Sequence, residues 1–265
     1  MVVGTGLGLA ADVVIVAGET ELERLVGRSR RIGADPELVV HGGGNTSTKT
    51  RETDHLGRER PVLRIKGSGT DLKTIGPDGF PGLWLDELLP LRQREAMSDE
   101  EMVAYLARCM TDPAARKPSI ETLLHAFLPA PHVDHVHADA ICALTNTAEP
   151  ERHVAAALGP DVAVVPYLRP GFGLSKQVAE LAGARAVVLA KHGLVTWGDT
   201  HEASLGLTLE LVARAEAYLA PRRPAPSAAP DVATPSLPDE ERRALSLALR
   251  GRLSRERRVV LVADP

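Results

Sequence analysis

The sequence predicts a layered α/β domain. Apolar segments with strand character alternate with amphipathic helical segments through residues 20–220, as in folds that pack helices on a sheet. Hydrophobic residues make up 44% and charged residues 25% of the 265 residues, so a chain of this length can bury a sizeable core. Aromatic residues are only 3%, and the core must therefore consist mainly of Leu, Val, Ile and Ala.

Helix and strand patterns can be assigned in order along this domain. Thr20 and Glu23 have the spacing of a capping box, which predicts a helix from there to about Arg31. The elements expected after it are strands at 38–40 and 62–66, each entering a glycine-rich turn, a strand and turn at 80–91, a helix at 98–111 capped by Ser98, a helix at 120–127, a strand at 132–141, a helix at 149–158, a strand at 162–167, a helix at 174–182, a strand at 186–190 and a helix at 200–219.

Composition separates the two ends of the chain from this domain. Residues 1–19 form an N-terminal extension, and its glycines precede a β-branched run, the wrong order for a dinucleotide-binding loop. Residues 20–220 form the main domain. Residues 221–238 hold six prolines and are expected to be a semi-extended linker. Residues 239–265 form a short C-terminal tail with one helix at about 239–252 and an apolar run at 259–262.

Charge and cysteine usage exclude several classes of protein. The net charge of −4 is the wrong sign for a duplex-DNA binder, and the few aromatic rings argue against stacking on bases. No apolar run has the length of a membrane span, and the first 18 residues lack the basic start of a signal peptide. Cys109 and Cys142 are too few for a disulfide framework, and we interpret both as small buried hydrophobes. We expect a cytoplasmic protein that binds neither nucleic acid nor membrane.

Three histidines are candidate metal ligands. His135 and His137 lie two residues apart in an expected strand, so both imidazoles point to one face and can reach one ion. His192 follows the apolar strand 186–190 and precedes Gly193, at the mouth of the sheet. The spacing alone leaves a purely structural role open for each of them.

Glu121 lies near the start of an expected helix, with His125 one turn later on the same face. A carboxylate there could bind a metal or move a proton. The alternative is an ordinary acid favoured by the positive end of the helix dipole.

The two glycine-rich turns are candidate anion sites. Consecutive backbone N–H groups in such turns form concavities that bind anions. Asn45, Ser47, Lys66, Ser68 and Gly69 have the donors and the charge of a phosphate cradle. Ordinary turn chemistry is the competing explanation.

Taken in order, these segments resemble the class II aldolase/adducin family over about residues 20–220. The motifs that carry the resemblance are Gly44-Asn45-Thr46-Ser47, Ser68-Gly69, Ser119-Ile120-Glu121, His135-Val136-His137 and His192-Gly193. The amino-acid sequences of residues 38–49, 117–125 and 165–173 most resemble the aldolase portion of the rhamnulose-1-phosphate aldolase/alcohol dehydrogenase fusions.

The resemblance implies a three-layer α/β/α sandwich with a mostly antiparallel mixed central sheet. It also implies a homotetramer with active sites at the subunit boundaries. His135, His137 and His192 would hold one Zn²⁺ per subunit, and Glu121 would be the catalytic acid/base. The residues that would bind the substrate phosphate are Asn45, Ser68, Gly69 and Ser119.

The implied activity is that of a metal-dependent lyase. The enzyme would cleave a ketose 1-phosphate, similar to rhamnulose 1-phosphate, to dihydroxyacetone phosphate and an aldehyde. The alternatives within the family are a sugar-phosphate 4-epimerase, a methylthioribulose-1-phosphate dehydratase and a non-catalytic adducin-like interaction domain. The three retained histidines favour an enzyme. Related aldolases also use a residue from a neighbouring subunit, and Tyr167 is a candidate for that role here.

Overall fold

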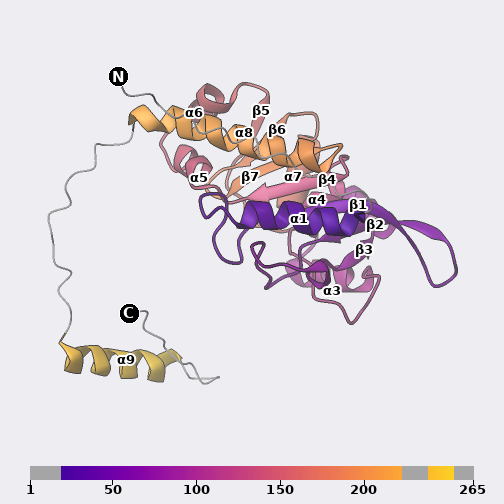
Figure 1. Ribbon diagram of the computed structural model, residues 1–265, viewed down its shortest axis with the longest axis horizontal. Coiled ribbons are helices and arrows are strands. Elements are labelled where there is room, and N and C mark those ends of the chain that lie inside the picture. Colours follow the sequence, from indigo (N-terminus) through magenta and orange to yellow (C-terminus); the bar gives the residue numbers. More distant parts are fainter. Residues whose placement is uncertain (1–18, 223–237, 254–265) are drawn as a thin grey trace. The chain divides into compact units, whose positions relative to one another are not determined.

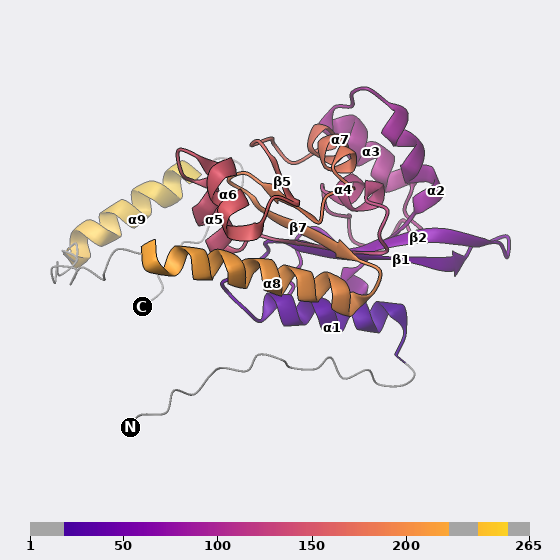
Figure 2. The same cartoon turned by 90° about the horizontal axis from the view of Figure 1, so that it is seen from above.

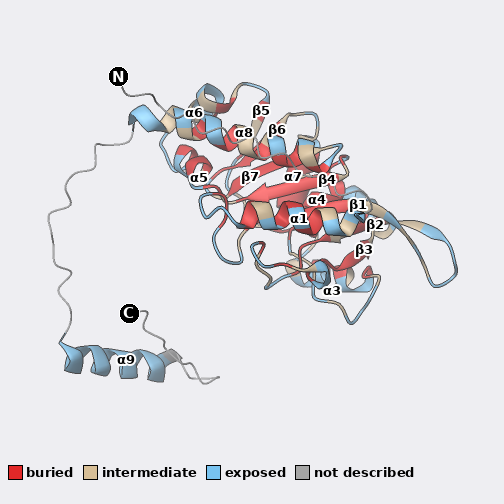
Figure 3. Ribbon diagram, viewed as in Figure 1, coloured by how far each residue is buried: buried red, intermediate tan, exposed pale blue. Residues whose placement is uncertain are grey.

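The computed structural model describes residues 19–222 and 238–253. The chain divides into two units, Met1–Arg222 and Arg223–Pro265, and the first contains the layered domain (Figure 1). In the second unit, helix α9 (Asp239–Leu253) matches the helix expected at 239–252 and is exposed at each residue from 239 to 252 (Figure 3). The glycines of the N-terminal extension, the linker residues 223–237 and the apolar run at 259–262 lie outside the described residues.

The centre of the first unit is a seven-stranded mixed sheet in the order β3-β2-β1-β4-β7-β6-β5. All neighbouring strands are antiparallel except β5 and β6, which run parallel. The strands are β1 (Asn45–Thr53), β2 (Glu59–Ile65), β3 (Gly82–Trp84), β4 (His132–Val136), β5 (Val162–Val165), β6 (Ala186–Leu189) and β7 (Gly193–Gly198). The sheet is therefore mostly antiparallel, as expected.

Helices cover both faces of this sheet and complete three layers. They are α1 (Glu21–Gly33), α2 (Leu85–Leu88), α3 (Asp99–Arg108), α4 (Thr122–Phe127), α5 (Asp139–Thr145), α6 (Pro150–Leu158), α7 (Phe172–Glu180) and α8 (His201–Leu219), with 3₁₀ turns at Pro77–Gly79, Leu89–Gln93 and Ala220–Arg222. Helices α1 and α8 lie side by side on one face, and α4 and α7 cover the other (Figure 2). None of the described helices is both long and apolar enough to cross a bilayer.

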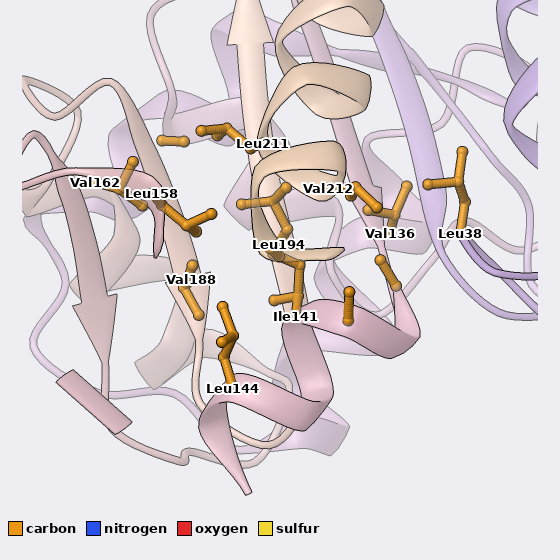
Figure 4. Packing of buried hydrophobic residues seen from close by; sticks show 14 of the residues in the cluster. Leu38, Val136, Ile141, Leu144, Leu158, Val162, Val188, Leu194, Leu211 and Val212 are labelled. Carbon is orange, nitrogen blue, oxygen red and sulfur yellow. The ribbon is translucent and has the colours of Figure 1, made fainter. Parts of the chain in front are cut away.

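Alternation along β4 explains why both faces are covered. Val133 packs with Leu124 of α4 and Val178 of α7, whereas Val136 belongs to the cluster on the α8 face. Figure 4 shows that second cluster, in which Leu211 and Val212 of α8 meet Ile141, Leu144, Val188 and Leu194. A strand buried on both faces places consecutive residues in two different cores.

Most expected elements are present with small shifts at their ends. The capping box of α1 is formed, with Thr20 accepting from the backbone N–H of Glu23 and the Glu23 carboxylate accepting from the N–H of Thr20. Ser98 caps α3 in the same way through Glu101. The strands expected at 62–66, 162–167 and 186–190 are confirmed as β2, β5 and β6.

Three expectations are wrong. Residues 38–40 form no strand; β1 begins after the glycine turn rather than before it. The strand expected at 132–141 ends at Val136, and α5 begins at Asp139. Residues 80–91 contain a three-residue strand followed by helical turns instead of a strand and turn.

The strand β1 has no apolar pattern because its buried positions are polar. Thr46 hydrogen bonds to Ser29 at 2.6 Å, Ser47 to His125 at 2.7 Å and Thr48 to His132 at 2.9 Å. Each hydroxyl is thus paired inside the core, where an unpaired one would be costly.

Candidate active site

Neighbouring strands and a tight turn bring the three histidines together. His135 lies in β4 opposite Val195 of β7 and Asn45 of β1. His192 lies in the turn between β6 and β7. The preceding Lys191 has φ +60°, a left-handed conformation that L-residues adopt at a cost, and its N–H donates to the Thr145 hydroxyl at 2.9 Å. This turn directs His192 toward β4.

The imidazoles converge through their Nε2 atoms. The Nε2 of His135 lies 3.1 Å from that of His137 and 3.3 Å from that of His192. The three ring centroids are 4.8–4.9 Å apart. Four ligands at the Zn–N length of about 2.0–2.1 Å stand about 3.3–3.4 Å from one another in a tetrahedron. The two nitrogen spacings around His135 fit such a site, and the ligand atoms of the three histidines all lie within 4.8 Å of one another.

The protonation of these rings also suits metal binding. His135 donates its Nδ1–H to the Leu194 carbonyl at 3.1 Å, which leaves the Nε2 lone pair free. Burial and the neighbouring His135 lower the pKa of His137 to about 3 and that of His192 to about 4. Both are therefore neutral at pH 7, the form that ligates a metal.

Backbone approaches the histidines too closely for additional side chains. A Cβ atom on Gly193 would lie 2.2 Å from the Val136 carbonyl oxygen and 3.1 Å from the ring of His135. A Cβ atom on Gly43 would lie 3.1 Å from Nδ1 of His137. The glycine after His192 is thus required by the close approach of β7 to the end of β4.

Glu121 lies against the histidines rather than inside the first helical turn. It occupies the N-cap position of α4 and is only 5% exposed. Its Oε2 is 3.5 Å from Nε2 of His135, and its Oε1 is 3.7 Å from Nε2 of His192. Asn45 donates to Oε2 at 2.7 Å, whereas Oε1 is buried with no hydrogen-bond partner among the described residues. The unpaired oxygen points to a missing partner at the position where the imidazoles converge.

Burial opposes ionisation of Glu121, but His135, His192 and the amide of Asn45 outweigh it and lower the pKa of the carboxyl. The site therefore presents three imidazoles, of which His137 and His192 are neutral at pH 7, and one carboxylate. That donor set is typical of a divalent transition metal.

The other candidate residues meet on one side of this cluster. The N–H of Ser68 donates to the Lys117 carbonyl at 2.8 Å, and a β-bridge joins Gly67 to Pro118. The Ser68-Gly69 loop therefore lies alongside Ser119, whose hydroxyl is 3.4 Å from the Asn45 amide nitrogen.

Within the described residues no backbone hydrogen bond is formed by the N–H group of Gly69, which lies in the turn at 68–69. Gly69 has φ +75°, and nothing lies within 4 Å of the position of its missing Cβ. Lys66 is buried beside the loop, and its Nζ donates to the Gly42 carbonyl at 3.1 Å. Burial lowers the pKa of this amine, although Asp71 and Glu121 act in the opposite direction.

Residues 23–219 match the model of the family described as the Class II Aldolase and Adducin N-terminal domain. The chain belongs to the class II aldolase/adducin family. It is 43% identical over 251 residues to "Uncharacterized oxidoreductase YuxG" of Bacillus subtilis (strain 168), which covers 92% of this chain and 36% of that protein. The chain thus spans about a third of the length of this curated relative, to which the description as an oxidoreductase belongs.

Solved structures of family members have the same architecture. The N-terminal class II aldolase domain of a conserved Thermoplasma acidophilum protein is 46% identical and superimposes with a TM-score of 0.73, covering 77% of this chain and 96% of that one. The l-fuculose-1-phosphate aldolase of Thermus thermophilus has a TM-score of 0.51 at 21% identity, covering 76% of this chain and 96% of that chain, and shows likeness of fold alone.

In this class II aldolase domain, the structure bears on the interpretations made from the sequence for Ser47, Tyr167 and the two cysteines. Ser47 is not in the cradle, because its side chain turns into the core and contacts His125. Tyr167 is 61% exposed in the segment after β5. Cys109 is buried in an apolar cluster, as interpreted, and Cys142 is half-buried with its Sγ 3.5 Å from the His192 carbonyl.

A second group of potential ligands, Glu21, His132 and His201, joins the two helices on the opposite face. Arg28 can only donate, so its 3.1 Å contact with Nδ1 of His201 places the ring hydrogen on Nε2. That Nε2–H then donates to Glu21 at 3.1 Å. Because neither ring nitrogen of His201 has a free lone pair, this group is an anchor between α1 and α8, not a metal centre.

Proposed function

We propose that this protein is a metal-dependent aldolase that cleaves a ketose 1-phosphate, similar to rhamnulose 1-phosphate, to dihydroxyacetone phosphate and an aldehyde. The observation that carries the proposal is the convergence of three imidazole nitrogens on a buried carboxylate. We propose Zn²⁺, one per subunit, as the ion that His135, His137 and His192 hold. By the same resemblance we propose a homotetramer.

An ion bound there would act as a Lewis acid toward the carbonyl and hydroxyl oxygens of the substrate as the carbon–carbon bond breaks. The bonding electrons stay on the carbon of the phosphorylated fragment. The hydroxyl that becomes the aldehyde carbonyl gives up its proton as the bond breaks. The Glu121 carboxylate, whose Oε2 is held by Asn45, takes up a proton at Oε1, its unpartnered oxygen, and delivers it to the carbon of the phosphorylated fragment, so the protons balance. The other fragment leaves as the aldehyde, so the reaction needs no water and no redox partner.

The phosphate would bind in the cradle formed by Asn45, Ser68, Gly69 and Ser119. The N–H group of Gly69 supports this assignment because a phosphate dianion accepts from such backbone donors. Lys66 contributes positive charge at the edge of the cradle. A phosphate anchored here leaves the carbons next to it at the imidazole cluster.

The proposal is tested by giving zinc-loaded protein a panel of ketose 1-phosphates and identifying the products. We expect dihydroxyacetone phosphate and one aldehyde in equal amounts, and a far slower reaction with the dephosphorylated ketose. Inversion at C4 without cleavage would identify an epimerase instead, and loss of water would identify a dehydratase. No conversion of any sugar phosphate would leave the adducin-like interaction domain as the better interpretation.

A further inference from the structure

Behind the proposed acid/base lies a continuous run of buried polar side chains. The Ser47 hydroxyl contacts Nδ1 of His125 at 2.7 Å, Nε2 of His125 contacts Oδ1 of Asn45, and Nδ2 of Asn45 contacts Oε2 of Glu121 at 2.7 Å. Ser47 and His125 are fully buried, and Asn45 and Glu121 are each 5% exposed. His125 itself carries none of the roles proposed for metal, phosphate or proton transfer.

Donors and acceptors in this run fit together in only one direction. Nδ2 of Asn45 lies 2.7 Å from Oε2 of Glu121, and a carboxylate oxygen accepts, so the Asn45 group that faces Glu121 is the amide NH₂. The Asn45 carbonyl then faces His125, whose Nε2 must carry a hydrogen. Burial lowers the pKa of His125 to about 3, so the ring is neutral and its Nδ1 must accept from the Ser47 hydroxyl.

We infer that His125 is a positioning residue that locks the Asn45 amide in this orientation and thereby decides which oxygen of Glu121 carries the proton. With Asn45 clamped, Oε2 accepts the amide hydrogen while lying 3.5 Å from Nε2 of His135, and Oε1, 3.7 Å from Nε2 of His192, is the oxygen left without a hydrogen-bond partner among the described residues. Without the hydrogen on Nε2, the amide of Asn45 is free to rotate by 180°. Its carbonyl would then face the carboxylate and repel it. The effect on rate rests on the proposed function, whereas the tautomer of His125 does not.

The fold explains why this run is fixed so firmly. Asn45 and Ser47 lie two apart in β1 and so point to the same face of the sheet. Helix α4, buried at each of its six residues, brings His125 between them and places Glu121 at its N-cap. One strand and one helix thus fix the positions of all four side chains, which hydrogen bond directly to one another.

The tautomer is measured directly on the wild-type protein. We expect ¹⁵N NMR of histidine-labelled, zinc-loaded protein to show His125 protonated at Nε2, with its signal unchanged between pH 5 and 8. A ring protonated at Nδ1, or a ring that titrates in this range, overturns the inference whether or not the protein cleaves any sugar phosphate.

Variants separate positioning from packing. His125→Phe removes the donor, and His125→Gln supplies an amide N–H near the position of Nε2. His132→Phe is the matched control, since His132 is also a buried histidine bonded to a β1 hydroxyl, that of Thr48, but lies on the other face of the sheet. We expect kcat to fall roughly 10–100-fold in His125→Phe, with partial recovery in His125→Gln and little change in His132→Phe.

Zinc content should stay at the wild-type value in all three variants. Equal losses of kcat in the two Phe variants, in proportion to their loss of thermal stability, would show that His125 acts only through packing and would overturn its role. If His125→Phe does not fold, the comparison is made with Ser47→Ala. That variant removes the hydroxyl that donates to Nδ1 but leaves Nε2 bonded to Asn45, so the NMR signal should still show protonation at Nε2, and protonation at Nδ1 would overturn the inference.

Discussion

At the scale of single residues, the histidines differ in how much of the fold depends on them. His135 is fully buried within β4, whereas His137 lies just beyond the strand and is half-buried. An alanine at 137 therefore removes a proposed metal ligand without opening a cavity in the core.

We expect His137→Ala to lose both zinc and activity while its melting temperature in chelator stays near that of the wild type, because two imidazoles hold the ion far more weakly than three. Metal analysis and thermal unfolding check this. His153→Ala, which removes a half-buried histidine bonded to Tyr218, is the control. Stoichiometric zinc in a variant with alanine at 135, 137 and 192 would contradict the site.

Glu121→Gln keeps the shape of the side chain but cannot accept a proton. We expect the rate to fall by about 10²–10⁴, as for the loss of a general acid/base. Zinc content should change little because three histidines suffice to hold it. Steady-state kinetics and metal analysis on the same sample check both expectations.

The competing account treats Glu121 as an acid at a helix start, worth about 0.3–1 kcal/mol of stability. It predicts a slightly lower melting temperature with normal turnover. Loss of zinc in Glu121→Gln would instead make this residue an obligatory ligand.

Much of this site can be predicted from the spacing of residues in the sequence, but not all of it. The three histidines and Glu121 could be proposed from their motifs, and the fold brings each of them within 3.7 Å of at least one of the others. The role of His125 could not be predicted, because it depends on pairing with Asn45 and Ser47, about 80 residues earlier. For the same reason Ser47 was assigned to the cradle when it faces the core.

At the scale of elements, the loop from Gly67 to Thr70 depends on one left-handed residue. Alanine at 69 meets no neighbour within 4 Å, so its only penalty is the strained backbone, about 1–2 kcal/mol. The loop relieves this strain by changing the direction of its N–H groups.

We therefore expect Gly69→Ala to raise KM for the phosphorylated substrate while leaving the slow reaction of the dephosphorylated ketose unchanged. Gly69→Asn should be milder, since asparagine tolerates this conformation. Gly57→Ala is a matched control: Gly57 has φ +77° and equally open surroundings, but lies in the β1–β2 hairpin turn (Figure 1). Equal kinetic changes at 57 and 69 would show that the loop does not bind phosphate.

Prediction of elements succeeded where the signal was local. The capping box at Thr20 needs only the next three residues, and the sequence was sufficient to place α1. Strand β1 was missed because its buried hydroxyls look like loop residues until their partners on α1, α4 and β4 are known. The start of α5 was missed because its apolar residues continue those of β4 without a turn signal.

At the scale of the whole molecule, three buried histidines make the fold sensitive to acid. Burial lowers the pKa values of His125, His132 and His201 to about 3, against about 6.5 in an unfolded chain. Unfolding therefore takes up protons as the pH falls below about 6.5. Their contribution to stability is complete above that pH and is lost progressively between about 6.5 and 3.

Urea unfolding of the zinc-free protein between pH 4 and 8 measures this dependence. Above pH 7 we expect these histidines to add no pH dependence to the free energy of unfolding. Below pH 6 the free energy of unfolding should fall by at most about 1.4 kcal/mol per pH unit for each histidine. His132→Phe should reduce that slope. A slope in acid equal to that of the wild type would show that His132 is protonated in the native state.

The close approach of backbone to the histidines has a consequence for the divergence of such proteins. At Gly193 every substitution adds a Cβ atom 2.2 Å from the Val136 carbonyl oxygen, and at Gly43 it adds one in tight contact, 3.1 Å from His137. Selection on a library of variants should thus find position 193 almost invariant, and position 43 restricted to small residues, whichever sugar phosphate is supplied. New substrate preferences would have to arise at other positions, such as Val40 and Ile120, which adjoin site residues in the sequence and are 65% and 39% exposed. The residues that fix the chemistry and the residues that determine the choice of substrate can therefore change independently during evolution.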